Sequence, residues 1–302
     1  SGKATLSVEI SGNGKVSVDP NKNFYDIGES VMITAEVVGS GSFLGYTGDS
    51  DQKEAILAIK IDKNTTITAN FADFNKGLVA YYPFNGNAND ESGNGNHGTV
   101  SGATLAADRN GESGNAYNFD GDDYIKILDN EILRPKHITI STWAYLPENG
   151  QGNSHILSKI EDVSVADLNK PTVLGAQYRL RIEGSKPKLD ISVGEQWQKA
   201  SGNDQIDSGK WTMITATWDG SIQRIYISGN FVIENSGATD GDIDNLTGGD
   251  LMIGKGWHPS SGFIKGKIDD IRIYNRALSE AEVAALYELE KPKLTDGLVA
   301  YY

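Results

Sequence analysis

The sequence predicts an all-β protein with one short helix near its C-terminal end, and three observations carry this prediction. Apolar and polar residues alternate in short runs along most of the chain, as in residues 6–10, which is the period of a strand with one buried face. The 302 residues include 35 glycines and 8 prolines, which is typical of many tight turns between short strands. Hydrophobic residues make up 38% and charged residues 23%, so the chain can bury a sizeable core.

Charge and cysteine content limit the partners of the chain. The formal charge of −14, with no basic cluster to reverse it locally, opposes a phosphate backbone, so nucleic acid is not an expected partner. The same acidity fits either binding of hard cations or a merely soluble surface. The chain has no cysteine, hence no disulfide and no thiolate site. No apolar run is long enough to span a bilayer, and we expect no membrane insertion.

Residues 5–71 alternate in short runs that are separated by turn signals such as Gly12-Asn13-Gly14. This pattern predicts a small β-sandwich, and we place the first domain at residues 1–74. A short hinge at 73–76 leads into a second domain, 75–290, which continues the strand pattern almost to its end. There Ser279 and Glu282 have the spacing of a capping box, and Val283, Leu286 and Tyr287 fall on one face, so we predict a surface helix at about 279–288.

The hexapeptide Gly-Leu-Val-Ala-Tyr-Tyr occurs at 77–82 and returns unchanged at 297–302, after a polar linker. A repeat spaced in this way indicates that a second copy of the large domain begins at the end of the sequence. We therefore interpret residues 291–302 as a linker and the first strand of a truncated following repeat, and expect a monomer within a tandem multidomain chain. A natural end at Tyr302 is the alternative.

The order of motifs in residues 5–72 resembles the divergent internalin-type B-repeat of bacterial surface proteins. The matching segments are Gly12-Asn13-Gly14-Lys15-Val16, Tyr25-Asp26-Ile27-Gly28-Glu29, Phe43-Leu44-Gly45-Tyr46-Thr47-Gly48-Asp49 and Ile67-Thr68-Ala69-Asn70-Phe71. Tyr46 stands where that family usually has Trp. The resemblance implies an Ig-like β-sandwich in a secreted protein, extracellular or on the cell surface.

Residues 77–288 resemble the laminin-G-like, concanavalin-A-like lectin superfamily. Six segments agree with it, namely 77–82, 89–98, 119–125, 138–143, 211–220 and 266–279, the last of which reads Gly-Lys-Ile-Asp-Asp-Ile-Arg-Ile-Tyr-Asn-Arg-Ala-Leu-Ser. The resemblance implies a jelly roll of two packed antiparallel sheets.

The polar loop 89–98 offers many oxygens, and its glycines let the backbone turn back on itself, as a calcium shell requires. The resemblance implies a structural calcium ion beside this loop, with Asp90, Asn96 and Asp269 as ligands. Asp270 is the alternative to Asp269, because neighbouring strand residues face opposite ways. A plain turn held by its own side-chain hydrogen bonds is the other interpretation of the loop. A second acidic group, Asp120, Asp122 and Asp123, is explained by a hairpin turn or by a second calcium ion.

Aromatic and basic residues indicate where a sugar would bind. Strand alternation assigns Trp143, Trp211 and Trp218 to the core. Two other tryptophans lie in polar or glycine-rich stretches, and the resulting prediction for ligand contacts is Trp197, Trp257 and His258. Arg179 and Arg181 share one strand face and either grip a uronate or sulfate in bidentate fashion or lie on a solvated face.

No arrangement of residues predicts catalysis. The four histidines lack zinc spacing, no Ser/His/Asp set is apparent, and the paired carboxylates of a retaining glycosidase are missing, so we name no catalytic residue. We predict a non-catalytic module that binds carbohydrate, with a glycan or glycoprotein as partner and a structural calcium ion. The alternative is a structural or adhesive spacer repeat in a surface array, without a glycan site of its own.

Overall fold

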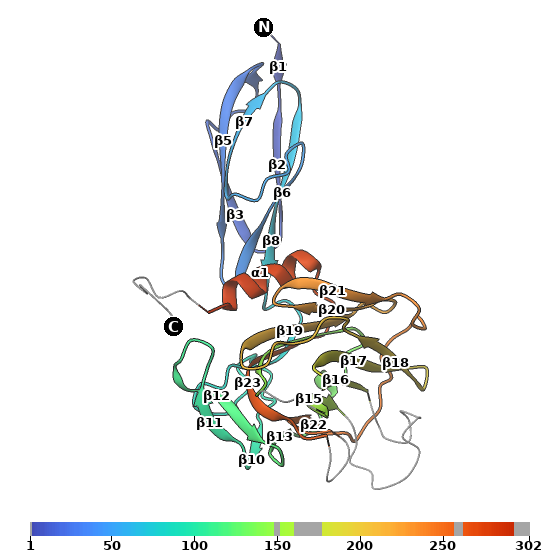
Figure 1. Ribbon diagram of the computed structural model, residues 1–302. Coiled ribbons are helices and arrows are strands. Elements are labelled where there is room, and N and C mark those ends of the chain that lie inside the picture. Colours follow the sequence, from blue (N-terminus) through green and yellow to red (C-terminus); the bar gives the residue numbers. More distant parts are fainter. Residues whose placement is uncertain (1, 148–151, 160–176, 257–261, 293–302) are drawn as a thin grey trace. The chain divides into compact units, whose positions relative to one another are not determined.

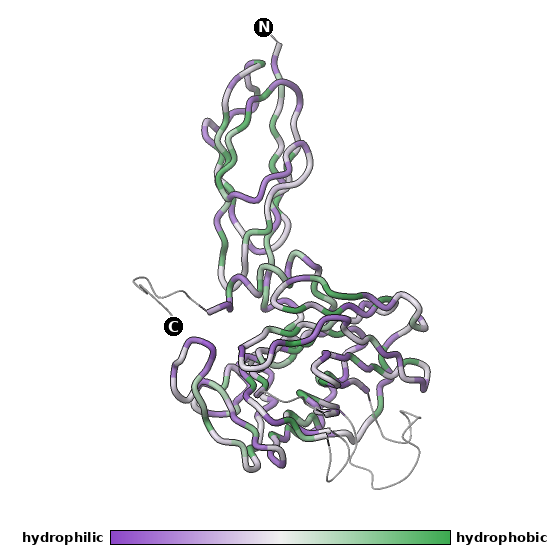
Figure 2. The backbone as a smooth tube through the Cα atoms, in the orientation of Figure 1, coloured by the Kyte–Doolittle hydropathy of each residue, from purple (hydrophilic) through white to green (hydrophobic). Residues whose placement is uncertain are grey.

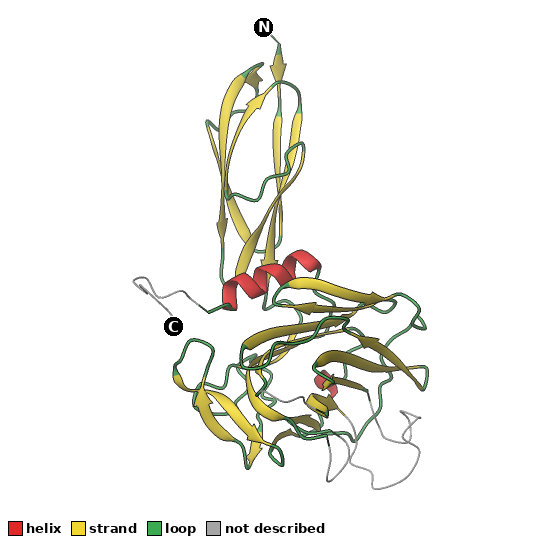
Figure 3. Ribbon diagram, in the orientation of Figure 1, coloured by secondary structure: helices red, strands yellow, loops and turns green. Residues whose placement is uncertain are grey.

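The computed structural model describes residues 2–147, 152–159, 177–256 and 262–292, and it confirms the predicted all-β class with one short α-helix (Figures 1 and 3). The alternation of hydrophilic and hydrophobic residues that predicts the strands can be followed along the backbone in Figure 2. The chain divides into two compact units, the first of residues 1–76 together with Ala284–Leu289, and the second of the remaining residues from Gly77 onward.

The N-terminal unit is built from two three-stranded sheets, β2-β8-β6 and β3-β5-β7, and a short pair, β1-β4. Its strands are β1 (Lys3–Ala4), β2 (Leu6–Ser11), β3 (Gly14–Asp19), β4 (Tyr25–Asp26), β5 (Glu29–Val37), β6 (Gly41–Gly48), β7 (Ile56–Ile61) and β8 (Thr65–Asp73). β2 and β8 run parallel, and the other pairs are antiparallel. Tyr46 is fully buried in the core of this unit, where its hydroxyl group donates to the carbonyl oxygen of Ala55 at 2.8 Å.

The larger unit is built from many short antiparallel strands. They are β9 (Leu78–Tyr82), β10 (Thr99–Ser101), β11 (Thr104–Ala107), β12 (Ser113–Asp120), β13 (Tyr124–Ile127), β14 (Ile138–Tyr145), β15 (Asn153–Lys159), β16 (Tyr178–Glu183), β17 (Lys186–Val193), β18 (Gln196–Ser201), β19 (Trp211–Trp218), β20 (Gln223–Ile227), β21 (Asn230–Asn235), β22 (Leu251–Ile253) and β23 (Lys265–Tyr274). A 3-10 helix, η1, covers Glu131–Leu133.

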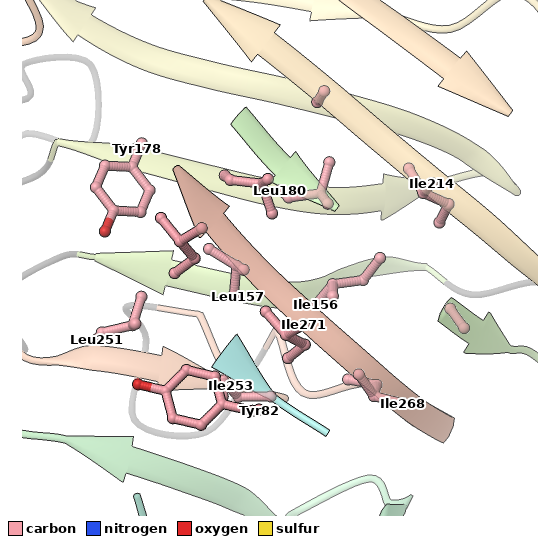
Figure 4. Packing of buried hydrophobic residues seen from close by; sticks show 14 of the residues in the cluster. Tyr82, Ile156, Leu157, Tyr178, Leu180, Ile214, Leu251, Ile253, Ile268 and Ile271 are labelled. Carbon is pink, nitrogen blue, oxygen red and sulfur yellow. The ribbon is translucent and has the colours of Figure 1, made fainter. Parts of the chain in front are cut away.

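These strands form two sheets. One has seven strands in the order β10-β13-β22-β15-β16-β17-β18, and the other has eight, β11-β12-β23-β14-β19-β20-β21 with β9 also paired to β23. Every strand pair in both sheets is antiparallel. Leu180 and Leu157 from the first sheet and Ile214 and Ile271 from the second belong to one buried cluster, shown in Figure 4. The residues between these core positions point to the outer faces of the two sheets.

The helix α1 covers Glu280–Glu290, close to the predicted range. The predicted capping box is present, because the Ser279 N–H donates to Glu282 Oε2 at 2.8 Å and the Glu282 N–H donates to Ser279 Oγ at 3.3 Å. Val283 and Leu286 are buried and Tyr287 is half-buried, as the periodicity predicts. Within the described ranges, no helix is long and apolar enough to cross a membrane.

Candidate functional site

Polar side chains gather on the outer face of the seven-stranded sheet. β16 sends Tyr178, Leu180 and Ile182 into the core, so Arg179 and Arg181 point the opposite way. The neighbouring strands contribute further residues to this face. We call the following set the polar face: His155, Ser158, Arg179, Arg181, Asp190 and Trp197.

A β-bulge in β15 places His155 and Ser158 on this face. In the register with β16, His155 lies opposite Arg181 and Leu157 lies opposite Leu180, so Ile156 is an additional residue without a partner. Ile156 and Leu157 are both buried in the core cluster. The bulge therefore lets two consecutive residues face the core while the residues on either side face outward.

Arg179 and Arg181 share a single carboxylate. The Nε atoms of the two arginines lie 2.7 and 2.8 Å from Asp190 Oδ2, and the Asp190 side chain is 0% exposed. The other oxygen, Asp190 Oδ1, is buried and has no hydrogen-bond partner among the described residues. The arginines do share one face, as predicted, but Asp190 engages their Nε atoms, so a bidentate grip on a uronate or sulfate would have to use the terminal Nη groups.

Arg181 has two more partners at its edge of the polar face. Its Nη1 atom donates to Asn153 Oδ1 at 3.0 Å and to the carboxylate of Glu183, which also accepts from Lys188 Nζ at 2.8 Å. The hydrogen bonds from Lys188 and Arg181 lower the pKa of Glu183 to about 2. Glu183 is therefore ionised at any pH at which the protein is expected to work.

His155 is neutral and incompletely bonded. Burial, followed by the charges of Arg179 and Arg181, lowers its pKa to about 3. Its Nδ1 atom is buried and has no partner in the described part of the chain. The imidazole packs closely against backbone, because a Cβ atom added to Gly256 would lie 2.7 Å from its Cδ2 atom.

The loop predicted to carry ligand contacts begins and ends beside His155. The His155 N–H donates to the carbonyl oxygen of Gly262 at 2.9 Å, and Ser158 Oγ donates to that of Lys255 at 2.8 Å. Trp257 and His258 themselves lie outside the described residues.

Trp197, which the sequence places in a polar stretch, lies in strand β18. Gly194 and Glu195, with φ of 58° and 63°, form the two-residue turn that joins β17 to β18. The carboxylate of Asp244 accepts the Gly194 and Glu195 N–H groups at 3.0 and 2.9 Å. This turn sets the register in which Trp197 lies opposite Ser192.

The Trp197 ring is half-buried, and the guanidinium carbon of Arg179 lies 4.5 Å from its centroid. Its Nε1 atom is buried and has no partner among the residues that the structure describes. The polar face thus combines an aromatic ring with three unpaired polar atoms, on Trp197, Asp190 and His155. Such a combination suits a ligand that has both an apolar face and hydroxyl groups.

In the segment after β9, Asp90 organises the loop 89–98. Its Oδ1 atom accepts the N–H groups of Tyr81 and Ser92, each at 2.9 Å, and its Oδ2 atom accepts that of Asn96 at 2.9 Å. Burial raises the pKa of Asp90, but the backbone donors outweigh burial and leave it below the ordinary value. The Asn96 side chain is also engaged, because it donates to the Val79 carbonyl oxygen at 3.2 Å and accepts from Asn130 at 3.0 Å.

Asp269 and Asp270 face the same side of the eight-stranded sheet, which corrects the expectation that they point in opposite directions. The pairing of β14 with β23 shifts between Ser141 and Trp143, and Asp270 has φ of +45°, as a bulge residue can. Both carboxylates contact Arg109 Nη1, at 2.7 Å for Asp269 and 2.6 Å for Asp270.

The Arg109 side chain also contacts the last residue of helix α1. Arg109 Nε donates to the Glu290 carbonyl oxygen at 2.6 Å, and its guanidinium carbon lies 4.9 Å from the Trp143 ring centroid. Burial, followed by the charge of Asp270, raises the pKa of Asp269 to about 8, against the lowering effect of Arg109.

The contacts of Asp90, Asn96 and Asp269 do not fit a calcium shell. A calcium ion needs six to eight oxygens, whereas both carboxylate oxygens of Asp90 already accept backbone N–H groups and those of Asp269 are bonded to the Asp270 N–H group and Arg109. Among the described residues, the carboxylate groups of Asp120, Asp122 and Asp123, at a hairpin turn, lie within 4.8 Å of one another. Asp90, Asp269 and Asp270 do not form such a group. Calcium binding through these three residues is thus an expectation from the sequence that their contacts do not support.

Three residues of the polar face are not predicted from the sequence as ligand contacts: His155, Ser158 and Asp190. Alternation in residues 186–193 could have identified Asp190 as an outward-facing residue of a strand. It could not have placed Asp190 opposite Arg179, because that depends on the register between β16 and β17. His155 depends on the bulge, which has no signal in the sequence.

A family model for the concanavalin A-like lectin/glucanases superfamily matches residues 119–284, which is more than half of the chain. No curated protein matches. Among solved structures, 440 chains match, so the fold is common and does not by itself specify a function.

Three of these structures illustrate the range. The binding domain of Paraclostridial mosquitocidal protein 1 is 17% identical, with a TM-score of 0.54 over 71% of this chain and 52% of that one. Domain 4 of AbnA, a GH43 extracellular arabinanase from Geobacillus stearothermophilus in complex with arabinotriose, is 21% identical, with a TM-score of 0.52 over 70% of this chain and 98% of that one. The botulinum neurotoxin type G receptor-binding domain is 18% identical, with a TM-score of 0.52 over 71% and 52%. The chain spans about half the length of the two toxin domains, and identities this low show a shared fold only.

Proposed function

The chain belongs to the concanavalin A-like lectin/glucanases superfamily, and from this premise we propose that its larger unit is a non-catalytic carbohydrate-binding module whose ligand lies on the polar face. One observation carries the proposal. A half-buried tryptophan, Trp197, lies beside the guanidinium group of Arg179, which is bonded to Asp190. An aromatic ring next to hydrogen-bonding groups is what a sugar ring requires, and a pure spacer has no need of it.

The solved relatives support this proposal through what their names state. The arabinanase domain was solved with arabinotriose, and the two toxin domains are called binding or receptor-binding domains. These properties belong to those proteins. They show that the shared fold is used to present binding surfaces, which is the role we propose here.

Asp190 of the polar face and Glu183 at its edge support binding without catalysis. A glycoside hydrolase needs a carboxylic acid whose pKa is raised so that it can protonate the leaving group. Asp190 is held by two arginines, and the pKa of Glu183 is lowered to about 2. Neither carboxylate is therefore suited to act as the acid.

The proposal is tested by titrating the full chain with oligosaccharides in a calorimeter, after a glycan array has found the best class. Trp197→Ala should weaken binding by more than about tenfold, because a central aromatic contact is worth about 2 kcal/mol or more. Trp211→Ala is the matched control: Trp211 is also half-buried, but it packs against Tyr145 in the other sheet. Equal affinity of wild type and Trp197→Ala, or a loss of affinity in Trp211→Ala alone, would show that the ligand does not bind at the polar face.

We further propose the setting that the sequence suggests: an extracellular or cell-surface bacterial protein, with a B-repeat before the module and further copies in tandem, each copy monomeric. The extracellular arabinanase supports the setting by its name, and the repeated hexapeptide supports the tandem copies. The competing spacer function predicts no binding to any glycan on the array. A null result with a folded protein would therefore favour the spacer.

A further inference from the structure

We infer that the glycan bound at the polar face is acidic, and that its carboxylate or sulfate group lies between Lys199 and the terminal Nη groups of Arg179, while a sugar ring lies beside Trp197. The inference rests on the proposed function and names the class of glycan. It replaces the arginine pair that the sequence suggests with one arginine and one lysine.

Positive side chains outnumber negative ones on the outer face of β16, β17 and β18, which are neighbouring strands (Figure 1). In these strands Leu180, Leu189 and Ala200 belong to the core cluster, so the alternate residues point outward. The outward-facing charged residues are five cations and two carboxylates, namely Arg179, Arg181, Lys186, Lys188 and Lys199, with Glu183 and Asp190. The whole chain has a formal charge of −14, so this excess is local. The sequence shows no basic cluster here, because the register brings the cations together from three strands.

Lys199 offers an unpaired positive charge at the surface. Its side chain is exposed and has no ion pair in the described part of the chain. In the register of the sheet, Lys199 lies opposite Asp190, and Asp190 lies opposite Arg179. The ion pairs of Asp190 are with two arginines and not with Lys199. An anion over this row would therefore meet a cation that has no carboxylate partner of its own.

Arg179 retains accessible donors for a ligand. A guanidinium group has five N–H donors, and among the described residues only the donor on Nε has a partner, Asp190. The Nη atoms are not among the buried side-chain atoms that lack a partner, so they are open to solvent. Arg181 is less suited, because its Nη1 atom is already bonded to Asn153 and Glu183.

The spacing of the three groups suits one acidic sugar. Arg179 and Lys199 are two strand intervals apart, which is roughly 10 Å between their backbones, and both side chains are long enough to reach over Asp190 between them. Trp197 precedes Lys199 by two residues on the same face, about 7 Å along the strand. The Trp197 ring centroid lies 4.5 Å from the guanidinium carbon of Arg179. An anionic group between the two cations would thus place its sugar ring next to the indole.

The experiment is a titration of the intact chain with two ligands that differ in charge, trigalacturonate and its methyl ester. We expect the acid to bind at least about tenfold more tightly than the ester, which is the gain of one hydrogen bond to a charged group. The affinity for the acid should fall as salt rises from about 0.1 to about 1 M, over which the Debye length falls from about 10 to about 3 Å. A sulfated oligosaccharide, titrated beside its desulfated form, tests a sulfate in the same way. The pair with the larger gain identifies the anion.

Two negative results have different meanings. Equal affinity within both pairs, or a neutral glycan as the best class on the array, would overturn this inference and leave the proposed function standing. No binding of any glycan would overturn the proposed function itself.

Lys199→Gln locates the anion. It should weaken trigalacturonate at least about tenfold and leave the affinity for the methyl ester unchanged, a difference that a merely structural role would not produce. Lys15→Gln, at an exposed lysine on β3, is the matched control, because it changes the net charge by the same amount and should bind as wild type does. An undiminished preference for the acid in Lys199→Gln would refute the contact with Lys199.

Discussion

Two buried titratable side chains of the larger unit affect stability in opposite directions as the pH changes. Asp269 has a raised pKa, so the folded state holds a proton that the unfolded state releases. His155 has a lowered pKa, so the folded state excludes a proton that the unfolded state binds. Their titration ranges overlap only below pH 6.5, the ordinary pKa of histidine, and each can be isolated by a single substitution.

For Asp269, stability is highest below its unfolded pKa of 3.8 and falls as the pH rises toward about 8. The groups facing its carboxylate are Arg109, Asp270 and Asp108, with Glu290 bonded to the same arginine. We expect Asp269→Asn to gain stability relative to wild type by at most about 1.4 kcal/mol per pH unit up to this pKa.

The measurement is urea denaturation of both proteins from pH 6.5 to about 8, a window that lies above the titration of His155. Asp207→Asn, at an exposed ion pair, should show no such trend. A constant difference between wild type and Asp269→Asn would mean that Arg109 keeps Asp269 ionised.

His155 gives the opposite sign. The contribution of its neutral form is complete above 6.5 and is lost as the pH falls toward about 3. Wild type should therefore lose stability relative to His155→Gln by at most about 1.4 kcal/mol per pH unit in this range. Thermal melts at several pH values test this, with the half-exposed His137→Gln as control. Parallel curves for wild type and His155→Gln would show that the imidazole is protonated within the fold, next to Arg179 and Arg181.

At the scale of elements, the loop 89–98 tests the interpretation of Asp90. We expect Asp90→Ala to lower the free energy of unfolding by about 2–4 kcal/mol, because one buried and two partly buried backbone N–H groups lose their acceptor. Glu91→Ala, at the exposed neighbouring position, should have little effect. If Asp90→Ala melts like wild type, the loop is held by other contacts.

Calcium provides a separate test of the same element. We expect calcium added after EDTA treatment to cause no rise in melting temperature that depends on Asp90 and Asp269, since every carboxylate oxygen of these two residues already has a partner. A ligand at 100 times its dissociation constant would stabilise the fold by about 2.7 kcal/mol, an effect that a melt would detect. A rise that disappears in Asp90→Ala and Asp269→Asn would restore the predicted calcium site.

The strands illustrate what the sequence can and cannot reveal. Period-two alternation predicts that Arg179 and Arg181 share a face, and the capping box predicts where α1 begins, because both signals are local. The partner of the arginines, Asp190, depends on register between strands, which is a tertiary property. The bulges at Ile156 and Asp270 move every later residue of the strand to the opposite face of the sheet. A prediction that assigns alternate residues to alternate faces is therefore wrong beyond each bulge.

At the scale of the whole molecule, the two units have separate hydrophobic cores. The cluster around Tyr46 and Ile33 contains residues 4–71 only, and the cluster around Leu180 and Ile271 contains residues 79–273 only. Each unit buries its own apolar surface, which is the condition for folding as a separate domain. We therefore propose that the predicted domains, 1–74 and 75–290, fold separately, which unfolding measurements can test.

We expect calorimetry of the intact chain to show two transitions that respond to different substitutions. Tyr46→Ala removes a fully buried ring and its hydrogen bond to Ala55, a change that costs about 3–5 kcal/mol. In a domain of this size each kcal/mol lowers the melting temperature by about 4–8 °C, so one transition should shift clearly. The other transition and the affinity for glycan should stay unchanged. Phe24→Ala, at a position that is 61% exposed in the same unit, is the control, and Trp218→Ala should move only the second transition. A single transition that shifts in both core variants would show that the two units unfold as one, and the proposed domain division would then be wrong.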